Sequence, residues 1–139
     1  MLSEDKNDRL TRVGPGTPGG IWFRRYWLPV AAIPEFAQEP VLTVKVLGEE
    51  LVAFRSENGV YGLLSQRCAH RGMPLVYGIP EAQGLRCSYH GWLFDNTGKC
   101  RERPFERESA PPERANILSY PVQEMGGLLW AYLGPSPAP

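Results

Sequence analysis

Four side chains that can bind a metal lie in two short segments of the chain. Cys68 and His70 belong to the first segment, and Cys87 and His90 belong to the second. The two segments contain both histidines of the protein and two of its three cysteines, spaced as C-x-H, sixteen residues, then C-x-x-H. Thiolate sulfur and imidazole nitrogen are ligands for zinc and for iron–sulfur centres, so the pattern predicts a metal site.

Each segment offers one cysteine and one histidine, and this mixture bears on the kind of centre. Zinc fingers of the Cys2His2 type take two cysteines from one hairpin and two histidines from a helix. Mixed pairs fit a two-metal centre in which one metal takes both sulfurs and the other both nitrogens, as in a Rieske [2Fe–2S] cluster. A single structural zinc and a chance spacing are the alternatives. Gly72 and Gly91 follow the two segments, where a close approach of bulky sulfides favours glycine.

Length and charge exclude several classes of protein. The chain has 139 residues, the size of one domain with a real core. Its fifteen basic and fifteen acidic residues cancel, which argues against a nucleic-acid partner because phosphate binding needs a basic surface. No apolar run approaches the roughly 20 residues that cross a bilayer, and the N-terminus lacks a signal-peptide core. We expect a cytoplasmic protein without membrane contact, whose cysteines serve metal binding or catalysis rather than disulfides.

Short β-branched and aromatic runs between turn residues predict an all-β fold, a sandwich or a barrel. Asn58-Gly59 between two apolar runs is a strong hairpin signal. The aromatic stretch 21–30 is expected to pack its rings on the core through a turn and a strand. The further strands are expected over residues 41–47, 51–55, 60–64, 84–87, 91–94, 120–125 and 128–133.

Composition divides the chain into three parts. Residues 1–20 end in a run of glycine and proline, so we expect an irregular N-terminal arm on the surface or against a neighbouring subunit. Residues 21–134 hold the predicted domain, and residues 135–139 form a proline-rich tail. The charged segment 101–114 is expected to be a solvated loop, with a docking surface as the alternative.

The sequence around the metal-binding segments resembles a known family. Cys-Ala-His-Arg-Gly at 68–72 and Cys-Ser-Tyr-His-Gly-Trp at 87–92 resemble the N-terminal Rieske domain of ring-hydroxylating oxygenase α subunits, most closely the phthalate-dioxygenase-like branch. The resemblance covers nearly the whole chain, and its flanking segments are residues 10–18, 24–27, 47–55, 93–95 and 126–135. It implies a Rieske fold of small antiparallel sheets, with two loops that hold the cluster at one tip.

The resemblance also implies a ligand set. Cys68 and Cys87 would hold one iron, and His70 and His90 would hold the other. The edges of the histidine rings would face outward at the tip and form the exit for electrons.

Three positions indicate the redox range of such a cluster. Met73, Tyr89 and Trp92 stand where respiratory Rieske proteins carry two disulfide-forming cysteines and a serine. Hydrogen bonds around the sulfurs set the reduction potential of a cluster. Without the disulfide and the serine hydroxyl, we expect a potential at the low end of the Rieske range of about −150 to +300 mV.

The oxygenases of this family continue into a second domain that holds a mononuclear iron, bound by two histidines and a carboxylate. Both histidines of this chain are assigned to the cluster, so its predicted chemistry is one-electron transfer and not hydroxylation. We expect the N-terminal domain, or a truncated form, of an aromatic ring-hydroxylating oxygenase α subunit. It would pass electrons from a reductase or ferredoxin to an iron site of a catalytic domain or neighbouring subunit, and the family suggests a trimer. A free-standing Rieske ferredoxin and a non-redox zinc module are the alternatives.

Five residues near the motifs have less specific expectations. Cys100 is expected to be a small core thiol and not a ligand. Trp92 and Phe94 are expected to shield the cluster from water. Arg71 either holds a neighbouring carboxylate or steadies its loop, or has no role in function. Tyr89 either donates a hydrogen bond to a cluster sulfur or packs its ring.

Overall fold

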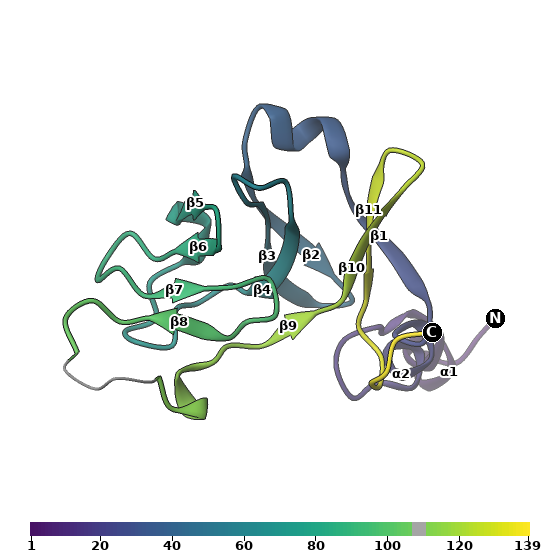
Figure 1. Ribbon diagram of the computed structural model, residues 1–139. Coiled ribbons are helices and arrows are strands. Elements are labelled where there is room, and N and C mark those ends of the chain that lie inside the picture. The colour runs from purple at the N-terminus through teal and green to yellow at the C-terminus, as the bar shows by residue number, and fades with distance from the viewer. Residues whose placement is uncertain (107–110) are drawn as a thin grey trace.

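The computed structural model describes residues 1–106 and 111–139, and three antiparallel sheets form the framework of this part of the chain (Figure 1). The first sheet has the order β1 (Trp27–Ala32), β11 (Leu128–Tyr132), β10 (Val122–Met125). The second has the order β2 (Val41–Val46), β3 (Glu49–Arg55), β4 (Tyr61–Ser65), β9 (Ser119–Tyr120). The third has the order β5 (Ile79–Glu81), β6 (Gly84–Arg86), β7 (Leu93–Phe94), β8 (Cys100–Glu102). The all-β prediction is confirmed.

The helical segments are short. In residues 1–106 and 111–139, two α-helices lie near the N-terminus and three 3-10 turns connect or precede strands. Among the described residues, none of the helices has the length and apolar character needed to cross a membrane. The helical segments are α1 (Glu4–Thr11), α2 (Pro18–Phe23), η1 (Ile33–Ala37), η2 (Leu75–Tyr77) and η3 (Glu113–Ala115).

Each strand given a residue range in the sequence analysis has a counterpart whose ends lie within two residues of the prediction. The hairpin predicted at Asn58-Gly59 joins β3 to β4, and Gly59 has the positive φ of +79° that this turn requires. The buried Ser56 closes the turn from its first strand. Its N–H donates to the carbonyl of Val60 at 2.8 Å, and its Oγ accepts from the N–H of Val60 at 3.0 Å.

The N-terminal segment differs from the prediction, because residues 1–20 contain α1 and the start of α2 instead of an irregular arm. Pro18 stands in the first turn of α2, where the N–H that proline lacks would have no partner in any case. Thr17 caps this helix by accepting from the N–H of Gly20 at 3.1 Å. Proline was expected to exclude a helix here, but Pro18 stands at the start of α2. The predicted boundary between residues 20 and 21 falls inside α2, and the division into parts stays a prediction.

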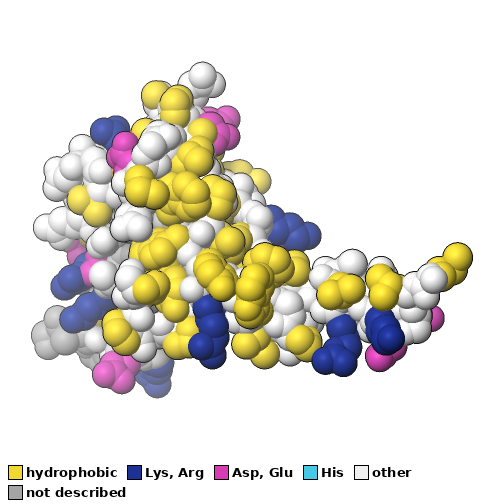
Figure 2. Space-filling view, turned by 90° about the vertical axis from the view of Figure 1, so that its right-hand side faces the viewer, with side chains coloured by type: hydrophobic (Ala, Val, Ile, Leu, Met, Phe, Trp, Pro, Cys, Tyr) yellow, Lys and Arg dark blue, Asp and Glu magenta, His cyan; other side chains and the backbone are white. Residues whose placement is uncertain are grey.

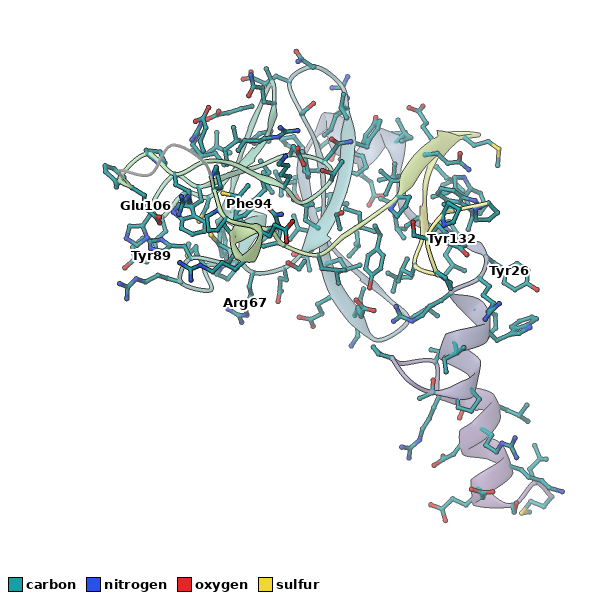
Figure 3. All side chains as sticks on the ribbon, turned by 60° about the horizontal axis from the view of Figure 1, so that its bottom comes forward. Tyr26, Arg67, Tyr89, Phe94, Glu106 and Tyr132 are labelled. Atoms are coloured by element: carbon teal, nitrogen blue, oxygen red, sulfur yellow. The ribbon has the colours of Figure 1, made fainter. Side chains whose placement is uncertain are left out.

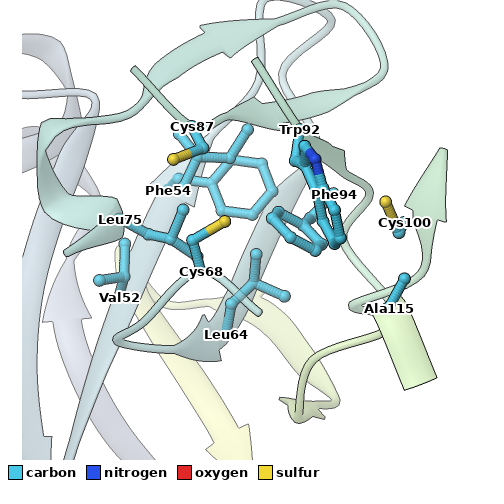
Figure 4. Packing of buried hydrophobic residues seen from close by; sticks show 11 residues of the cluster. Val52, Phe54, Leu64, Cys68, Leu75, Cys87, Trp92, Phe94, Cys100 and Ala115 are labelled. Atoms are coloured by element: carbon cyan, nitrogen blue, oxygen red, sulfur yellow. The ribbon is translucent and has the colours of Figure 1, made fainter. Parts of the chain in front are cut away.

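The second sheet lies between two separate apolar clusters. Alternate residues of β3 face opposite sides, so Val52 and Phe54 belong to one cluster and Leu51 and Ala53 to the other. The cluster around Phe54 also contains Cys68 and Cys87, together with side chains of the third sheet (Figure 4). The predicted metal-binding loops therefore rest on a packed core of their own.

One face of the molecule is rich in exposed apolar side chains. Figure 2 shows them over the middle of this face and along the projecting N-terminal helices. On α2 and the turn after it, Trp22 is 56% exposed and Tyr26 is 51% exposed, and their ring centroids are 5.1 Å apart. At the C-terminal end, the indole N–H of Trp27 donates to the carbonyl of Pro139 at 3.3 Å.

Candidate metal centre

The first metal-binding loop follows β4 and is closed by two backbone hydrogen bonds around Cys68. The N–H of Cys68 donates to the carbonyl of Met73 at 3.0 Å, and the N–H of Gly72 donates to the carbonyl of Cys68 at 2.9 Å. Gly72 has a φ of +70°, in the left-handed region that other residues enter only at a cost. A Cβ on Gly72 would meet no atom within 4 Å, so the backbone conformation, not lack of space in the protein, calls for glycine.

The second loop joins β6 to β7 and repeats this turn around Cys87. The N–H of Cys87 donates to the carbonyl of Trp92 at 2.8 Å, and the N–H of Gly91 donates to the carbonyl of Cys87 at 3.0 Å. Gly91 has a φ of +75°. Each loop thus has a cysteine, a left-handed glycine four residues later, and a closing carbonyl five residues later.

The two turns differ in where they carry their histidine. His70 stands two residues after its cysteine, whereas His90 stands three residues after its own. The structure nevertheless brings both imidazoles together, with ring centroids 4.6 Å apart and ring planes at 73°. The sequence spacing alone did not show that the rings would meet.

The cysteines lie below the loops, in the apolar core (Figure 4). Cys68 is 4% exposed and Cys87 is 3% exposed. Burial raises the pKa of the Cys68 thiol to about 11, and the nearby Cys87 thiol adds to this shift. The backbone N–H groups of His70 and Arg71 oppose the shift by donating to the Cys68 sulfur. A metal bound here therefore has to replace a tightly held proton.

The histidines lie nearer the surface than the cysteines, and each packs against an aromatic ring. His70 stacks on Trp92 with ring centroids 4.8 Å apart and planes at 9°, and His90 lies 3.8 Å from the ring of Tyr89. Both imidazoles are half-buried. The Nδ1 atom of His70 is buried without a hydrogen-bond partner, so its lone pair is available to a metal.

The donors come together as two pairs of like atoms. The cysteine sulfurs are neighbours in the core, and the imidazoles are neighbours above them. In the described part of the chain, no three histidine, cysteine, aspartate or glutamate side chains converge on a point that could hold one metal ion. Two neighbouring sulfurs and two neighbouring imidazoles suit a two-metal centre in which each metal takes one pair of like donors.

Cys100 is a core thiol, as predicted. It is 1% exposed, and its thiol donates to the carbonyl of Glu102 at 3.7 Å. Figure 4 places it on the far side of Trp92 and Phe94 from the other two sulfurs. Burial raises its pKa as well. Cys100 is thus held away from the four predicted ligands.

Further side chains surround the four predicted ligands. Trp92 and Phe94 are buried, as a shield would be, and Trp92 also supports the ring of His70. Tyr89 is 61% exposed, and its ring packs on His90. Arg71 has an exposed side chain and contributes its backbone N–H to the Cys68 sulfur. The guanidinium of Arg103 lies 5.7 Å from the centre of the Trp92 ring.

The burial of Arg103 shows that segment 101–114 is not solvated along its whole length, whereas a solvated loop had been expected. Its side chain is 6% exposed and pairs with Glu106. The start of the segment belongs to β8, and residues 107–110 lie outside the described part of the chain. The sequence pattern of alternating charges gave no sign that one of these arginines would be buried against the site.

Two more arginines were missed by the sequence reasoning. Arg67 directly precedes Cys68, and Arg86 directly precedes Cys87. Both donate hydrogen bonds to the loops that follow them. Figure 3 shows Arg67 and Tyr89 at one end of the molecule, and Tyr26 at the other. The candidate site is thus a tip, remote from the N-terminal helices.

Comparisons with known proteins agree with this geometry. A family model described as the Rieske [2Fe-2S] domain matches residues 26–121. The chain is 49% identical over 143 aligned positions to the 5,5'-dehydrodivanillate O-demethylase oxygenase subunit of a Sphingobium species, covering 100% of this chain and 34% of that protein. It is 37% identical over 141 positions to the phthalate 4,5-dioxygenase oxygenase subunit of Pseudomonas putida, covering 99% of this chain and 32% of that protein.

A solved structure supports the same family. The Pseudomonas putida CBB5 NdmA QL mutant with theobromine superimposes with a TM-score of 0.75 and 32% sequence identity, covering 81% of this chain and 35% of that one. The chain therefore spans about a third of the length of the relatives it matches. The family match indicates a Rieske-type [2Fe–2S] cofactor and a role in electron transfer. By sequence, by fold and by the paired donors at its tip, this chain belongs to the Rieske [2Fe-2S] domain family.

Proposed function

We propose that this chain carries one electron at a time through a cluster held by Cys68, His70, Cys87 and His90. The observation that supports this most is the depth of the donors, with sulfurs buried and imidazoles half-buried at the tip. When bound, a Rieske cluster accepts and releases one electron. The buried cysteines would hold the cluster away from water, and the half-buried histidines would hold it near the surface, where a partner protein can approach.

We assign both cysteines to one iron and both histidines to the other. The pairing of like donors supports this assignment. Two ferric ions, two sulfides and two thiolates carry a total charge of about zero, whereas a cluster with four thiolates carries about minus two. An electron enters a neutral cluster more easily. Histidine ligands therefore raise the potential from roughly −400 mV in plant-type clusters to about −150 to +300 mV.

Within that range we expect a low midpoint potential. Met73 and Tyr89 cannot form the disulfide of respiratory Rieske proteins, and Trp92 lacks the hydroxyl of their serine. Fewer hydrogen bonds to the sulfurs leave the reduced state less stabilised. A redox titration followed by visible circular dichroism measures the midpoint directly. A value well above about +100 mV, in the upper part of the Rieske range, would contradict this expectation.

We further propose the direction of electron flow, from a reductase or ferredoxin to a mononuclear iron in an oxygenase catalytic domain in the cytoplasm. The relatives named as oxygenase subunits support this proposal. Both histidines within these 139 residues are assigned to the cluster, so two histidine ligands for a second iron must come from other sequence. By the family resemblance we expect a homo-oligomer, a trimer, in which a catalytic domain that lies outside these 139 residues would supply them from a neighbouring subunit.

The experiment that tests the proposal is a metal analysis of anaerobically purified protein. We expect two irons and two acid-labile sulfides per chain, and after dithionite reduction an EPR spectrum with the low average g of a Rieske centre. Zinc alone, with no EPR signal even after reconstitution with iron and sulfide, would leave a structural zinc module and refute the electron-transfer role.

A further inference from the structure

The arginine that precedes each metal-binding cysteine makes the same contact in both loops. Nη1 of Arg67 donates to the carbonyl of Gly72 at 2.9 Å, and Nη1 of Arg86 donates to the carbonyl of Gly91 at 2.7 Å. In both loops the acceptor belongs to the glycine with positive φ, four residues after the cysteine. Each guanidinium therefore links the residue before its loop to the last peptide group of that loop.

This contact is suited to fix the position of the histidine. In both loops the histidine lies between the cysteine and the glycine, at different distances along the chain. The backbone bonds between Cys68 and Gly72, and between Cys87 and Gly91, close only the inner turn. A donor that binds the glycine carbonyl restrains the last peptide group of the loop. It thereby limits the conformations open to the preceding residues, which include the histidine. A hydrogen bond from a charged donor is about twice as strong as a neutral one.

We propose that Arg67 and Arg86 are positioning residues that hold the two loops in the conformation that binds the cluster. The proposal rests on the proposed function, since it assumes that Cys68, His70, Cys87 and His90 are the ligands. It assigns to the arginines no contact with the cluster itself. Their effect is carried by the glycine carbonyls of the loops.

Arg86 is the more strongly anchored of the two. Its side chain is 21% exposed, and its Nη2 atom lies 2.8 Å from a carboxylate oxygen of Glu81 and 2.7 Å from one of Glu102. Glu81 lies on β5 and Glu102 on β8, so one guanidinium joins both edge strands of the third sheet to the second loop. Its hydrogen bonds lower the pKa of Glu81.

Arg67 stands in a different setting. Its side chain is exposed, and among the described residues its hydrogen bond goes to Gly72 without a carboxylate partner. Water competes for an exposed donor, so its restraint on the loop is weaker. We therefore expect the same kind of effect at both positions and a larger one at Arg86.

The test uses the full chain loaded with its cluster. In Arg86→Gln, we expect bleaching of the visible absorbance by an iron chelator to be at least about tenfold faster, because a partly buried charged hydrogen bond and the ion pairs of Arg86 are lost. For Arg67→Gln, we expect an increase of about threefold. We also expect broader EPR features of the reduced cluster in both variants, because the ligand loops sample more conformations.

Matched controls separate this role from general loss of stability. Arg24→Gln removes a guanidinium that is 14% exposed and pairs with Glu49. Arg55→Gln removes an exposed arginine at the end of β3. Neither lies in a metal-binding loop, so cluster loss and EPR line shape should match the wild-type protein.

Conservative variants provide the sharper readout. Arg67→Lys keeps a donor for the glycine carbonyl and should restore wild-type cluster retention. In Arg86→Lys, an ammonium cannot reproduce the planar fork that contacts two carboxylates and a carbonyl, so rescue should be incomplete. If the Arg86→Gln protein does not fold, cluster retention in Arg67→Gln compared with Arg67→Lys tests the proposal.

Two results would overturn the inference. One is cluster loss in Arg67→Gln and Arg86→Gln at the rates of their controls, with unchanged EPR spectra. The other is equal damage in Arg67→Lys and Arg67→Gln. In both cases wild-type protein still binds iron and sulfide, so this failure is distinguishable from failure of the proposed function, in which the wild-type protein has no cluster.

Discussion

Cys87→Ala is expected to abolish assembly of the [2Fe–2S] cluster, while Cys100→Ala leaves its iron content and spectrum intact. The two thiols form a matched pair, because both are buried, at 3% and 1% exposure, in the same apolar cluster. The substitution removes the same sulfur atom from a similar environment in each case. A site with four donors has no spare ligand, and losing one also removes folding energy that the metal supplies.

The same loss is expected for alanine at Cys68, His70 or His90. Iron and acid-labile sulfide analysis, with the EPR spectrum of the reduced protein, provides the measurement. A variant with the iron content and spectrum of the wild-type protein would remove that residue from the ligand set. Loss of the spectrum in Cys100→Ala would show instead that the cluster is sensitive to any change in this core.

Phe94→Ala should lower the free energy of unfolding by about 3–5 kcal/mol, the usual cost of removing a buried phenylalanine ring. Phe94 is fully buried on β7 beneath the second loop, with its ring centroid 6.4 Å from that of Trp92. Its removal leaves a cavity next to the residue that supports His70. Urea unfolding followed by far-UV circular dichroism measures the change.

Phe105→Ala is the control for this experiment. It makes the same change at a side chain that is 83% exposed, where a substitution usually changes stability by less than about 0.5 kcal/mol. A loss below about 1 kcal/mol in Phe94→Ala would mean that the surrounding side chains collapse into the space, since the cost of such changes depends on how much of the cavity remains.

The sequence identified candidate donors for the site, but it gave no sign of the contacts that support them. Donor chemistry depends on residue type, so Cys68, His70, Cys87 and His90 could be selected from spacing alone. Gly72 and Gly91 were noted for a close approach of sulfides, whereas the structure shows that their positive φ also calls for glycine. The contacts of Arg67 and Arg86 could not be, since an arginine next to a cysteine has many possible partners. The stacking of His70 on Trp92 joins residues from different loops and has no local signal.

In the fold, too, some elements were predicted from the sequence and others were missed. Hydrophobic alternation and turn residues revealed the longer strands, such as β2 and β3, because both signals extend over several residues. β5 and β8 were missed because β5 contains a proline and β8 two charged residues, so neither shows an apolar run. The N-terminal helices were missed for another reason. Proline and glycine were treated as breakers, although proline is favoured in the first turn of a helix.

The separation of the two apolar clusters by β3 has a consequence for how the protein matures. Leu51 and Ala53 pack on the side away from the metal-binding loops, with side chains of the first sheet. This half of the molecule includes none of the cofactor's proposed ligands, so it can remain closed while the tip opens locally. Insertion of iron and sulfide then becomes the last local closing step on a scaffold that is already folded. The apolar residues of this half can then stay covered while the cofactor is inserted.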